Sequence, residues 1–323
     1  MSSFPYEKAQ KESVPCNFCK SNDLEILARE GQDGLPLTTV ICKKCGLIFI
    51  NPRMTSYWYG RYYQEEYRAK TIGHDAGRGT PDSVRLFSQM ERHGEEMAMQ
   101  MKGSFKGGTI LEVGSSLGGV LAGIKKVLKI PVVGIEPSRP EANYAGKRGI
   151  KTYPSLIEDI EKTGGSIGMF GAVVCTQSLN HFLDPRYFFE FAHRHLSPDG
   201  ILVLEVMNFR HQLKKAGKFK NAVKIDHTYM YTPETLKAFV EAAGFDILTA
   251  SVDEWKGEGM LRRLSRALPT VHMTCIARKS GRTPFAEVVP KASNYRKIKR
   301  SLNKVKIYFG YLFNYRLRKL LHL

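Results

Sequence analysis

The sequence predicts an α/β protein, in which a parallel sheet carries helices on both faces between a small cysteine-rich module and a basic tail. Short apolar runs alternate with segments of helical period between residues 108 and 280, which is the pattern of a parallel sheet. Four of the six cysteines fall within residues 16–45. The tail, residues 291–323, contains ten Lys or Arg and no Asp or Glu.

The predicted elements follow in order from local signals. The strands are short apolar runs, as expected for strands that are buried on both faces, and turn residues such as Ser197-Pro198-Asp199-Gly200 separate them from the helices. Thr232 and Pro233 mark the start of the last helix. We expect the last two strands to pair as an antiparallel hairpin. The predicted strands are 109–113, 131–136, 171–176, 201–207, 245–251 and 271–277, and the predicted helices are 83–103, 117–128, 139–147, 185–196 and 232–243.

Four parts of the chain are predicted: a metal-binding module (1–55), an aromatic linker with a helical lid (56–107), a sheet domain (108–280) and a basic amphipathic tail (281–323). Four tyrosines of the linker either cover a bound ligand or pack the module onto the sheet domain, and both interpretations stay open. They are Tyr59, Tyr62, Tyr63 and Tyr67.

Composition limits the class of protein. Hydrophobic residues are 42% and charged residues 25% of the 323 residues, which excludes wholesale disorder and a collagen-like chain. The net charge of +18 favours an acidic partner: a nucleotide-linked substrate, a nucleic acid or an anionic membrane surface. The N-terminus lacks a signal-peptide pattern, and no apolar run is long enough to cross a bilayer. A cytoplasmic location is therefore expected.

The grouped cysteines predict a structural zinc site. Cys16 and Cys19 form one Cys-x-x-Cys pair, and Cys42 and Cys45 form a second, followed by Gly46. Two such pairs supply four thiolates, a tetrahedral set that favours zinc and leaves no open coordination position. The alternative is four unligated thiols. Cys175 and Cys275 lie in apolar strands and are expected to pack in the core.

A glycine-rich turn predicts a nucleotide-type cofactor. Glu112-Val-Gly114-Ser-Ser-Leu-Gly118-Gly119 joins a strand to a helix, and Glu136 ends the next strand 22 residues after Gly114. Glycines let a backbone approach a ligand, and a carboxylate at that distance can hold ribose hydroxyls. A second carboxylate beside the turn would repel a pyrophosphate but attract a sulfonium and an amino group. This favours S-adenosylmethionine over a nicotinamide dinucleotide.

These motifs resemble class I S-adenosylmethionine-dependent methyltransferases, together with Gly134-Ile-Glu136-Pro-Ser138, Ser178–Pro185 and Leu196–Glu205. The cysteines, Asn51-Pro-Arg53 and the tyrosines are similar to a subgroup with an N-terminal zinc-binding domain, which includes C-methyltransferases of nucleotide-linked deoxysugars. The resemblance covers about residues 13–280 and implies a Rossmann-like seven-stranded sheet. It implies that 108–280 binds S-adenosylmethionine through Glu112, Gly114, Ser115, Gly118, Glu136, Thr176, Gln177 and Ser178. Ser116 replaces the family's third glycine, and Asn180 replaces its frequent Glu.

Methyl transfer to a hydroxyl or to an enolisable carbon needs a base. The segment Asp226-His227-Thr228-Tyr229 supplies the first candidates, with His227 as the base, Asp226 orienting it and Tyr229 beside them. It resembles the acid–His pair of sugar C-methyltransferases. His181, after the fourth strand, is the second candidate, and such a His is often structural. The sequence predicts methyl transfer to a small-molecule acceptor, such as a sugar nucleotide or related carbohydrate, at carbon or oxygen.

Two other functions stay open. A zinc-ribbon RNA methyltransferase fits the charge, but the chain has no Asn/Asp-Pro-Pro-Tyr/Phe motif and its charge is concentrated in the tail, so nucleic acid is the less favoured partner. A non-catalytic module with the same fold is the other. The tail, residues 291–323, is able to lie on an anionic membrane, to dock on the body or to stay solvated.

Overall fold

The computed structural model describes residues 4–67, 83–162, 167–252 and 272–303. Its centre is a seven-stranded sheet in the order β12-β13-β10-β9-β6-β7-β8. The strands from β10 to β8 are parallel, whereas β13 is antiparallel to both of its neighbours. The predicted alternation and the predicted final hairpin are confirmed. The strands are β6 (Ile110–Val113), β7 (Val132–Ile135), β8 (Lys151–Tyr153), β9 (Phe170–Thr176), β10 (Leu196–Met207), β12 (Phe245–Val252) and β13 (His272–Lys279).

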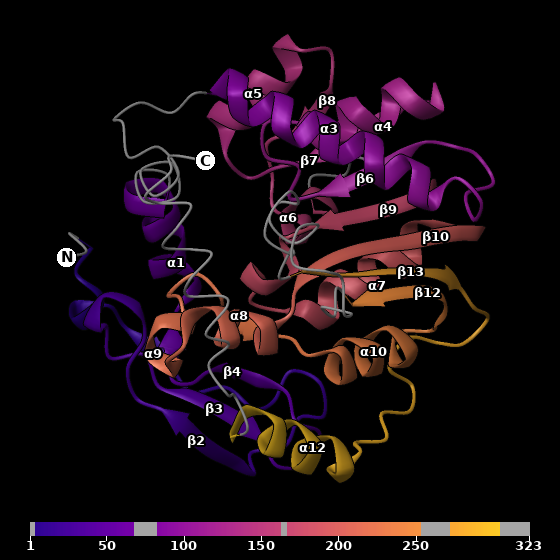
Figure 1. The fold of residues 1–323 in the computed structure, drawn as a ribbon. Coiled ribbons are helices and arrows are strands. Elements are labelled where there is room, and N and C mark those ends of the chain that lie inside the picture. The colour runs from indigo at the N-terminus through magenta and orange to yellow at the C-terminus, as the bar shows by residue number, and fades with distance from the viewer. Residues whose placement is uncertain (1–3, 68–82, 163–166, 253–271, 304–323) are drawn as a thin grey trace, which may run out of the picture.

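Helices cover both faces of this sheet, and Figure 1 shows the sheet running from β8 at the top to β12 below. The residues on each strand alternate between the two faces: Leu111 and Val173 face one core cluster, whereas Ile110 and Val174 face the other. One face is covered by α3 (Ser83–Met101), α4 (Gly119–Leu128) and α5 (Arg139–Lys147), and the opposite face by α6 (Ile157–Ile160), α7 (Pro185–His195) and α10 (Pro233–Ala242).

The strand of this sheet that comes third in chain order, β8, was not predicted. β8 has only three residues, Lys151-Thr152-Tyr153, and lies at the sheet edge with none of them buried. A strand of this kind lacks the apolar run that indicates a buried strand. The predicted turn 197–200 appears as an irregularity within β10, where the register shifts between Leu196 and Ile201.

The N-terminal module has its own four-stranded sheet, β11-β4-β3-β2. One of its strands, β11 (Tyr229–Met230), comes from the sheet domain and pairs with β4. Two distant parts of the chain therefore share one sheet. The other elements of residues 4–67 are η1 (Tyr6–Lys8), β1 (Lys11–Glu12), β2 (Leu24–Ala28), η2 (Gln32–Gly34), β3 (Thr39–Cys42), β4 (Ile48–Ile50), β5 (Arg53–Met54), α1 (Ser56–Tyr62) and the π-helical turn η3 (Tyr63–Tyr67). Between β9 and β11 the chain also forms η4 (Leu179–His181), α8 (Phe209–Ala216) and α9 (Phe219–Ala222).

The described part of the tail docks on the body. Helix α12 (Ala292–Asn303) lies beside the module strands (Figure 1), and its Ile298 and Leu302 are buried there. Lys299 forms an ion pair with Glu25 on β2, and Lys297 forms one with Glu234 on α10. The apolar tail residues beyond Asn303, and the linker residues 68–82, lie outside the described part. Among the described helices, none has the length and apolar character that crossing a membrane requires.

Candidate functional site

The four grouped cysteines converge on one point. Their sulfur atoms all lie within 4.8 Å of one another. The Sγ–Sγ distances are 3.5 Å for Cys16–Cys45 and for Cys19–Cys42, and 3.7 Å for Cys19–Cys45. A tetrahedral zinc ion with bonds of about 2.3 Å would separate its sulfur ligands by roughly 3.8 Å. The arrangement and the donor chemistry therefore fit a structural zinc ion.

Each cysteine pair closes with the same tight turn. The amide of Gly46 donates to the carbonyl of Cys42 at 2.8 Å, and the amide of Lys20 donates to that of Cys16 at 2.8 Å. Both residues have positive φ, +85° and +59°. Only glycine adopts this conformation without strain, and a side chain on Gly46 would also meet Ile298 of α12 at 2.7 Å. Gly46 therefore serves both the turn and the docking of the tail helix.

The glycine turn after β6 is tightly packed. Gly114 has a φ of +77°, and a Cβ there would lie 2.4 Å from Oγ of Ser178. A Cβ on Gly134 of β7 would lie 2.4 Å from Oγ of Ser115. Ser116, at the position where the resemblance implies a glycine, also adopts a positive φ of +49°. The turn therefore keeps the glycine-type backbone despite that substitution.

Glu112, the last residue but one of β6, carries a buried carboxyl group that is 1% exposed. Burial raises its pKa to about 8, because a charged form is poorly solvated there. Within the described residues, Oε2 of Glu112 and Oγ of Ser115 are buried without a hydrogen-bond partner. Buried polar atoms are normally paired. These two atoms are therefore suited to receive a polar, cationic ligand group.

Glu136 lies just after β7, at the same edge of the sheet. Its Oε2 accepts from the amide of Ser116 at 2.9 Å, and its Oε1 accepts from the amide of Ser138 at 2.8 Å. These bonds fix the orientation of the carboxylate beside the glycine turn.

The segment Thr176-Gln177-Ser178 follows β9 and closes the same edge. Oγ of Ser178 donates to the carbonyl oxygens of Gly114, at 3.3 Å, and Thr176, at 3.1 Å. Gln177 has a φ of +56°, and its Nε2 donates to Glu205 at 2.8 Å. The structure thus places all the predicted cofactor-binding residues around the carboxyl ends of β6, β7 and β9, where open α/β sheets bind ligands.

The predicted acid–base residues form a second cluster. His181, in η4, and the Asp226–His227 segment meet, with Oδ2 of Asp226 3.7 Å from Nδ1 of His181 and 3.9 Å from Nε2 of His227. The two imidazole rings are 5.0 Å apart and nearly perpendicular. The hydroxyl of Tyr63 lies 3.0 Å from Nδ1 of His181. These ligand atoms lie close enough together to hold a cation, but they also suit proton transfer.

The charge state of this cluster follows from burial. Burial lowers the pKa of His227 to about 3 and lowers that of His181 as well, so both imidazoles are neutral at pH 7. Burial alone would raise the pKa of Asp226, but His227, His181 and Lys224 together bring it below its ordinary value. The cluster therefore contains one carboxylate beside two neutral imidazoles, which is the state that a proton acceptor needs.

Tyr229 is not brought into this cluster. Its ring packs against Phe49 of β4, with centroids 5.8 Å apart, and its hydroxyl contacts Arg53 and the carbonyl of Leu183. The linker tyrosines lie in two places. Tyr59 and Tyr62 pack in the module core, whereas Tyr63 and Tyr67 lie against His181.

Three further polar residues adjoin the cofactor edge and were not predicted. Glu205, near the end of β10, lies 2.9 Å from Nε2 of His93 on α3 and 3.7 Å from Nδ1 of His272 on β13. The bond to Glu205 raises the pKa of His93. Glu205 could have been found from the sequence, because it is a charged residue inside the apolar run of β10. His93 lies in a polar helix, and no sequence pattern marks it as a site residue.

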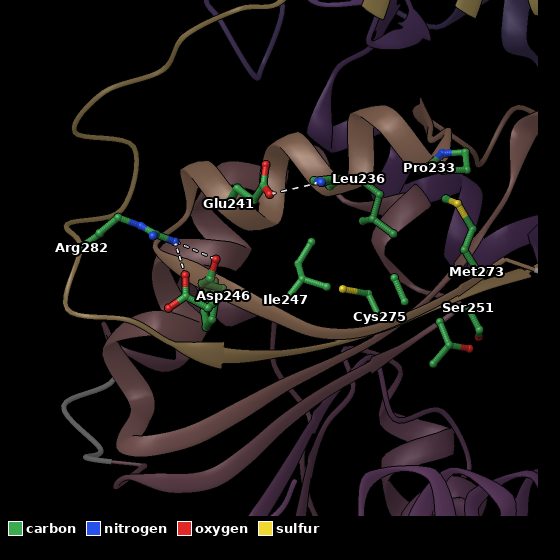
Figure 2. A pocket seen from close by; sticks show the side chains of 13 residues that line it. Pro233, Leu236, Glu241, Asp246, Ile247, Ser251, Met273, Cys275 and Arg282 are labelled. Carbon is green, nitrogen blue, oxygen red and sulfur yellow. Dashed lines mark hydrogen bonds and ion pairs between the residues drawn. The ribbon is translucent and has the colours of Figure 1, made fainter.

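A cavity lies elsewhere, between α10 and the strands β12 and β13. It has a volume of about 570 Å³, and none of the predicted site residues lines it. Figure 2 shows apolar side chains such as Ile247 and Met273 inside it, with the Arg282–Asp246 ion pair at one end. We therefore locate the chemistry by the polar clusters and not by this cavity.

The fold and the cofactor edge define a class. In this sheet a glycine turn follows β6, the first strand in chain order, and a carboxylate lies near the end of each of the first two strands, β6 and β7. This strand order and these features are those of the class I S-adenosylmethionine-dependent methyltransferases. Residues 85–250 match the family described as "Methyltransferase domain". This match covers just over half of the 323 residues, and the chain belongs to that family.

Two similar proteins agree with this. C-methyltransferase NovU of Streptomyces niveus is 25% identical over 228 residues, which are 69% of this chain and 50% of NovU. The matched part thus spans about half the length of that relative. The plantazolicin methyltransferase BpumL, solved with a triazolic desmethylPZN analog and SAH, has a TM-score of 0.51 at 14% identity. The alignment covers 69% of this chain and 94% of BpumL, which shares the fold.

Proposed function

We propose that the protein methylates a small-molecule acceptor, a sugar nucleotide or a related carbohydrate, at carbon or oxygen. The observation that carries this proposal is the cluster of His181, Asp226 and His227 beyond the cofactor edge, because it offers a buried neutral base to an acceptor. The similarity to a protein named as a C-methyltransferase supports it. Lys224, half-buried and close enough to lower the pKa of both imidazoles, favours an acceptor with negative charge.

In this proposal Glu112 faces the cationic methionine part of S-adenosylmethionine, Glu136 holds the ribose, and Gly114, Ser115 and Gly118 form the turn beneath them. Thr176, Gln177 and Ser178 line the sulfonium side. When bound, S-adenosylmethionine supplies an electrophilic methyl group on a sulfonium with an excellent leaving group. We assign the structural zinc ion to Cys16, Cys19, Cys42 and Cys45.

His227 takes the proton that the acceptor loses when its new bond forms. The acceptor O–H or C–H bond would break and its electron pair would form the new bond to the methyl carbon, while the methyl–sulfur bond would break with its electrons staying on the departing sulfur. The proton would pass to the imidazole of His227. The carboxylate of Asp226, 3.9 Å from Nε2, stabilises the resulting positive charge. For carbon methylation the acceptor needs a carbonyl next to the attacked carbon, since an isolated C–H bond is not acidic enough.

The direct test is methyl transfer from radiolabelled S-adenosylmethionine to a nucleoside-diphosphate-linked keto-deoxysugar, with the product analysed by mass spectrometry. We expect a mass increase of one methyl group. Label transfer to RNA but not to the sugar nucleotide would reject the proposed acceptor class, and absence of S-adenosylmethionine binding in titration calorimetry would reject catalysis.

The pH dependence of cofactor affinity tests the role of Glu112. Because the pKa of Glu112 is about 8 in the free protein and a cationic ligand needs its ionised form, binding must expel a proton below that pH. We expect the affinity for S-adenosylmethionine to rise by up to about tenfold per pH unit from pH 6 to 8 and then to level off. Calorimetry in buffers of different ionisation enthalpy measures the released proton.

Glu112→Gln is the matched control for this measurement. The cofactor's own amino group titrates in the same range, so the difference between wild type and Glu112→Gln isolates the protein group. The variant should bind the cofactor weakly, yet its ligand-free form should be about 1–3 kcal/mol more stable at pH 7, because a buried carboxyl with a raised pKa destabilises the fold. Equal pH profiles for the two proteins would contradict the assignment.

For the tail we propose that any contact with an anionic membrane is made by residues 304–323. The described part, α12, buries Ile298 and Leu302 against the module, so this part of its apolar face is occupied. Flotation with anionic liposomes should be lost when residues 304–323 are removed. Equal flotation of the full-length and shortened chains would reject membrane contact by this segment.

A further inference from the structure

One arginine of the zinc module contacts both chain segments that carry the candidate base residues. Arg53 lies on β5, and its side chain is 11% exposed. Its Nη1 donates to the carbonyl of Leu183 at 2.7 Å and lies 3.3 Å from the hydroxyl of Tyr229. Leu183 follows His181 by two residues, and Tyr229 follows His227 by two. We propose that Arg53 is a positioning residue that sets the two imidazoles relative to each other.

The two segments are already joined to each other by hydrogen bonds. Oγ1 of Thr228 donates to the carbonyls of Asn180, at 3.1 Å, and Phe182, at 2.8 Å. Nδ2 of Asn180 donates back to the carbonyl of Tyr229 at 3.0 Å. These bonds hold the two segments side by side, but they do not fix the position of the two segments relative to the zinc module. Arg53 adds that relation because it reaches both segments from a separate element.

The chemistry of the contact requires a guanidinium. Nε of Arg53 forms an ion pair with Oε1 of Glu12 on β1 at 2.9 Å, which fixes the plane of the group. The Nη1 donor then points at the carbonyl of Leu183 and at Tyr229. A guanidinium carries several donors in one rigid plane, whereas a lysine carries one point charge on a flexible stem. Lysine could keep the charge here but not all three contacts.

A second module contact reaches the His181 segment from the metal site itself. Asn17 lies between Cys16 and Cys19, and its Nδ2 donates to Oδ1 of Asp184 at 2.9 Å. Its Oδ1 accepts from the amide of Arg186 at 3.1 Å. Together with Arg53, this contact places the metal-binding module behind the loop that carries His181. The module is therefore built to orient the acid–base cluster as well as to fold around its metal.

Arg53→Met and Arg53→Lys test this proposal, which rests on the proposed function because it assumes that the cluster removes the acceptor's proton. With a nucleoside-diphosphate-linked keto-deoxysugar as acceptor, we expect kcat to fall about 10–100-fold in Arg53→Met, with a smaller fall in Arg53→Lys. The dissociation constant for S-adenosylmethionine and the zinc content should stay within about twofold of wild type. Millimolar methylguanidinium should partly restore kcat in Arg53→Met.

Hydrogen–deuterium exchange gives a readout that needs no turnover. We expect faster amide exchange in Arg53→Met over both 179–184 and 226–231, with β6 and β7 unchanged. Glu12→Gln is the matched control, because it removes the charge of the ion-pair partner while its amide oxygen can still accept from Nε of Arg53 and hold the plane of the guanidinium. Its kcat should stay within about threefold.

The possible results separate this proposal from the proposed function. Unchanged exchange in both segments, or wild-type kcat in Arg53→Met, would overturn the positioning role. If wild type itself transfers no methyl group to the sugar nucleotide, the proposed acceptor fails, while the exchange data still decide on Arg53. If Arg53→Met does not fold, Arg53→Lys carries the test, and wild-type kcat and exchange in that variant would overturn the proposal.

Discussion

Replacing His227 by alanine is expected to reduce the methyl-transfer rate by about 10²–10⁴-fold, the usual contribution of a general base. The affinity for S-adenosylmethionine should change by less than about threefold, because the base acts on the acceptor and the cofactor residues lie on β6, β7 and β9. His227 is buried, neutral at pH 7 and 3.9 Å from the carboxylate of Asp226. The rate should be measured as kcat with both substrates saturating, together with calorimetry for the cofactor.

The pH profile adds a second expectation for the same residue. Because burial lowers the pKa of His227, its neutral form persists well below pH 6.5. At saturating cofactor, kcat should therefore stay level as the pH falls to about 5, where an exposed histidine would already have lost activity. A fall of kcat centred near pH 6.5 would contradict the buried neutral base.

Two comparisons decide whether the effect belongs to His227 in particular. His195→Gln changes an imidazole on α7 that pairs with Glu161, away from the cluster, and should keep wild-type kcat. His181→Ala should lower kcat less than His227→Ala does. If His181→Ala lost more, the base would be His181, and unchanged turnover in His227→Ala would remove that residue from the mechanism.

That the proposed cofactor-binding residues meet at one edge of the sheet could be predicted from sequence, because their signals are local. Glu112, the glycine turn and Glu136 lie within one β-α-β unit of 25 residues, and the topology of such a unit fixes where its polar ends meet. The cysteine pairs were equally visible, since two short motifs supply the whole ligand set. In each case the chemistry depends on residues that are close in the chain.

The remaining parts of the site depend on contacts between distant segments. The pairing of β11 with β4 joins residues about 180 apart, and Tyr63 meets His181 across 118 positions. Neither contact produces a periodic pattern in the sequence from which it could have been predicted. For the same reason Tyr229 looked like a neighbour of His227, although β11 begins only at Tyr229 and the hydroxyl of that residue turns to Arg53 and to the carbonyl of Leu183.

Removing the zinc ion is expected to abolish turnover and to lower the thermal stability of the whole chain. Structural zinc sites contribute about 10–16 kcal/mol of apparent binding free energy, which is comparable with the total stability of a typical protein. Here Phe18, beside the proposed metal ligand Cys19, packs on Phe239 of α10 with ring centroids 4.8 Å apart. Loss of the metal should therefore loosen the core beneath the sheet as well as the module.

Chelation followed by metal analysis, calorimetry and activity measurement tests this. We expect kcat to fall more than 100-fold and the melting temperature to drop by about 10 °C or more, with turnover restored by one equivalent of zinc. Cofactor affinity at low temperature should fall much less, since Glu112 lies on β6 of the large sheet and Glu136 is held by the amides of Ser116 and Ser138. Cys275→Ser, at a buried cysteine outside the cluster, is the control and should keep one zinc per chain.

Whether chelation lowers kcat in the protein that remains folded separates two roles for the module. If zinc served only to fold residues 1–55, chelation would lower stability while the protein that remains folded kept its kcat. If the module also orients the acid–base cluster, through β11, Arg53 and Asn17, kcat should fall at temperatures where circular dichroism still shows a folded sheet domain. The shared sheet predicts the second outcome, a fall in kcat while the sheet domain stays folded. β11 begins two residues after His227 and pairs with β4, so β11 shifts when β4 becomes disordered.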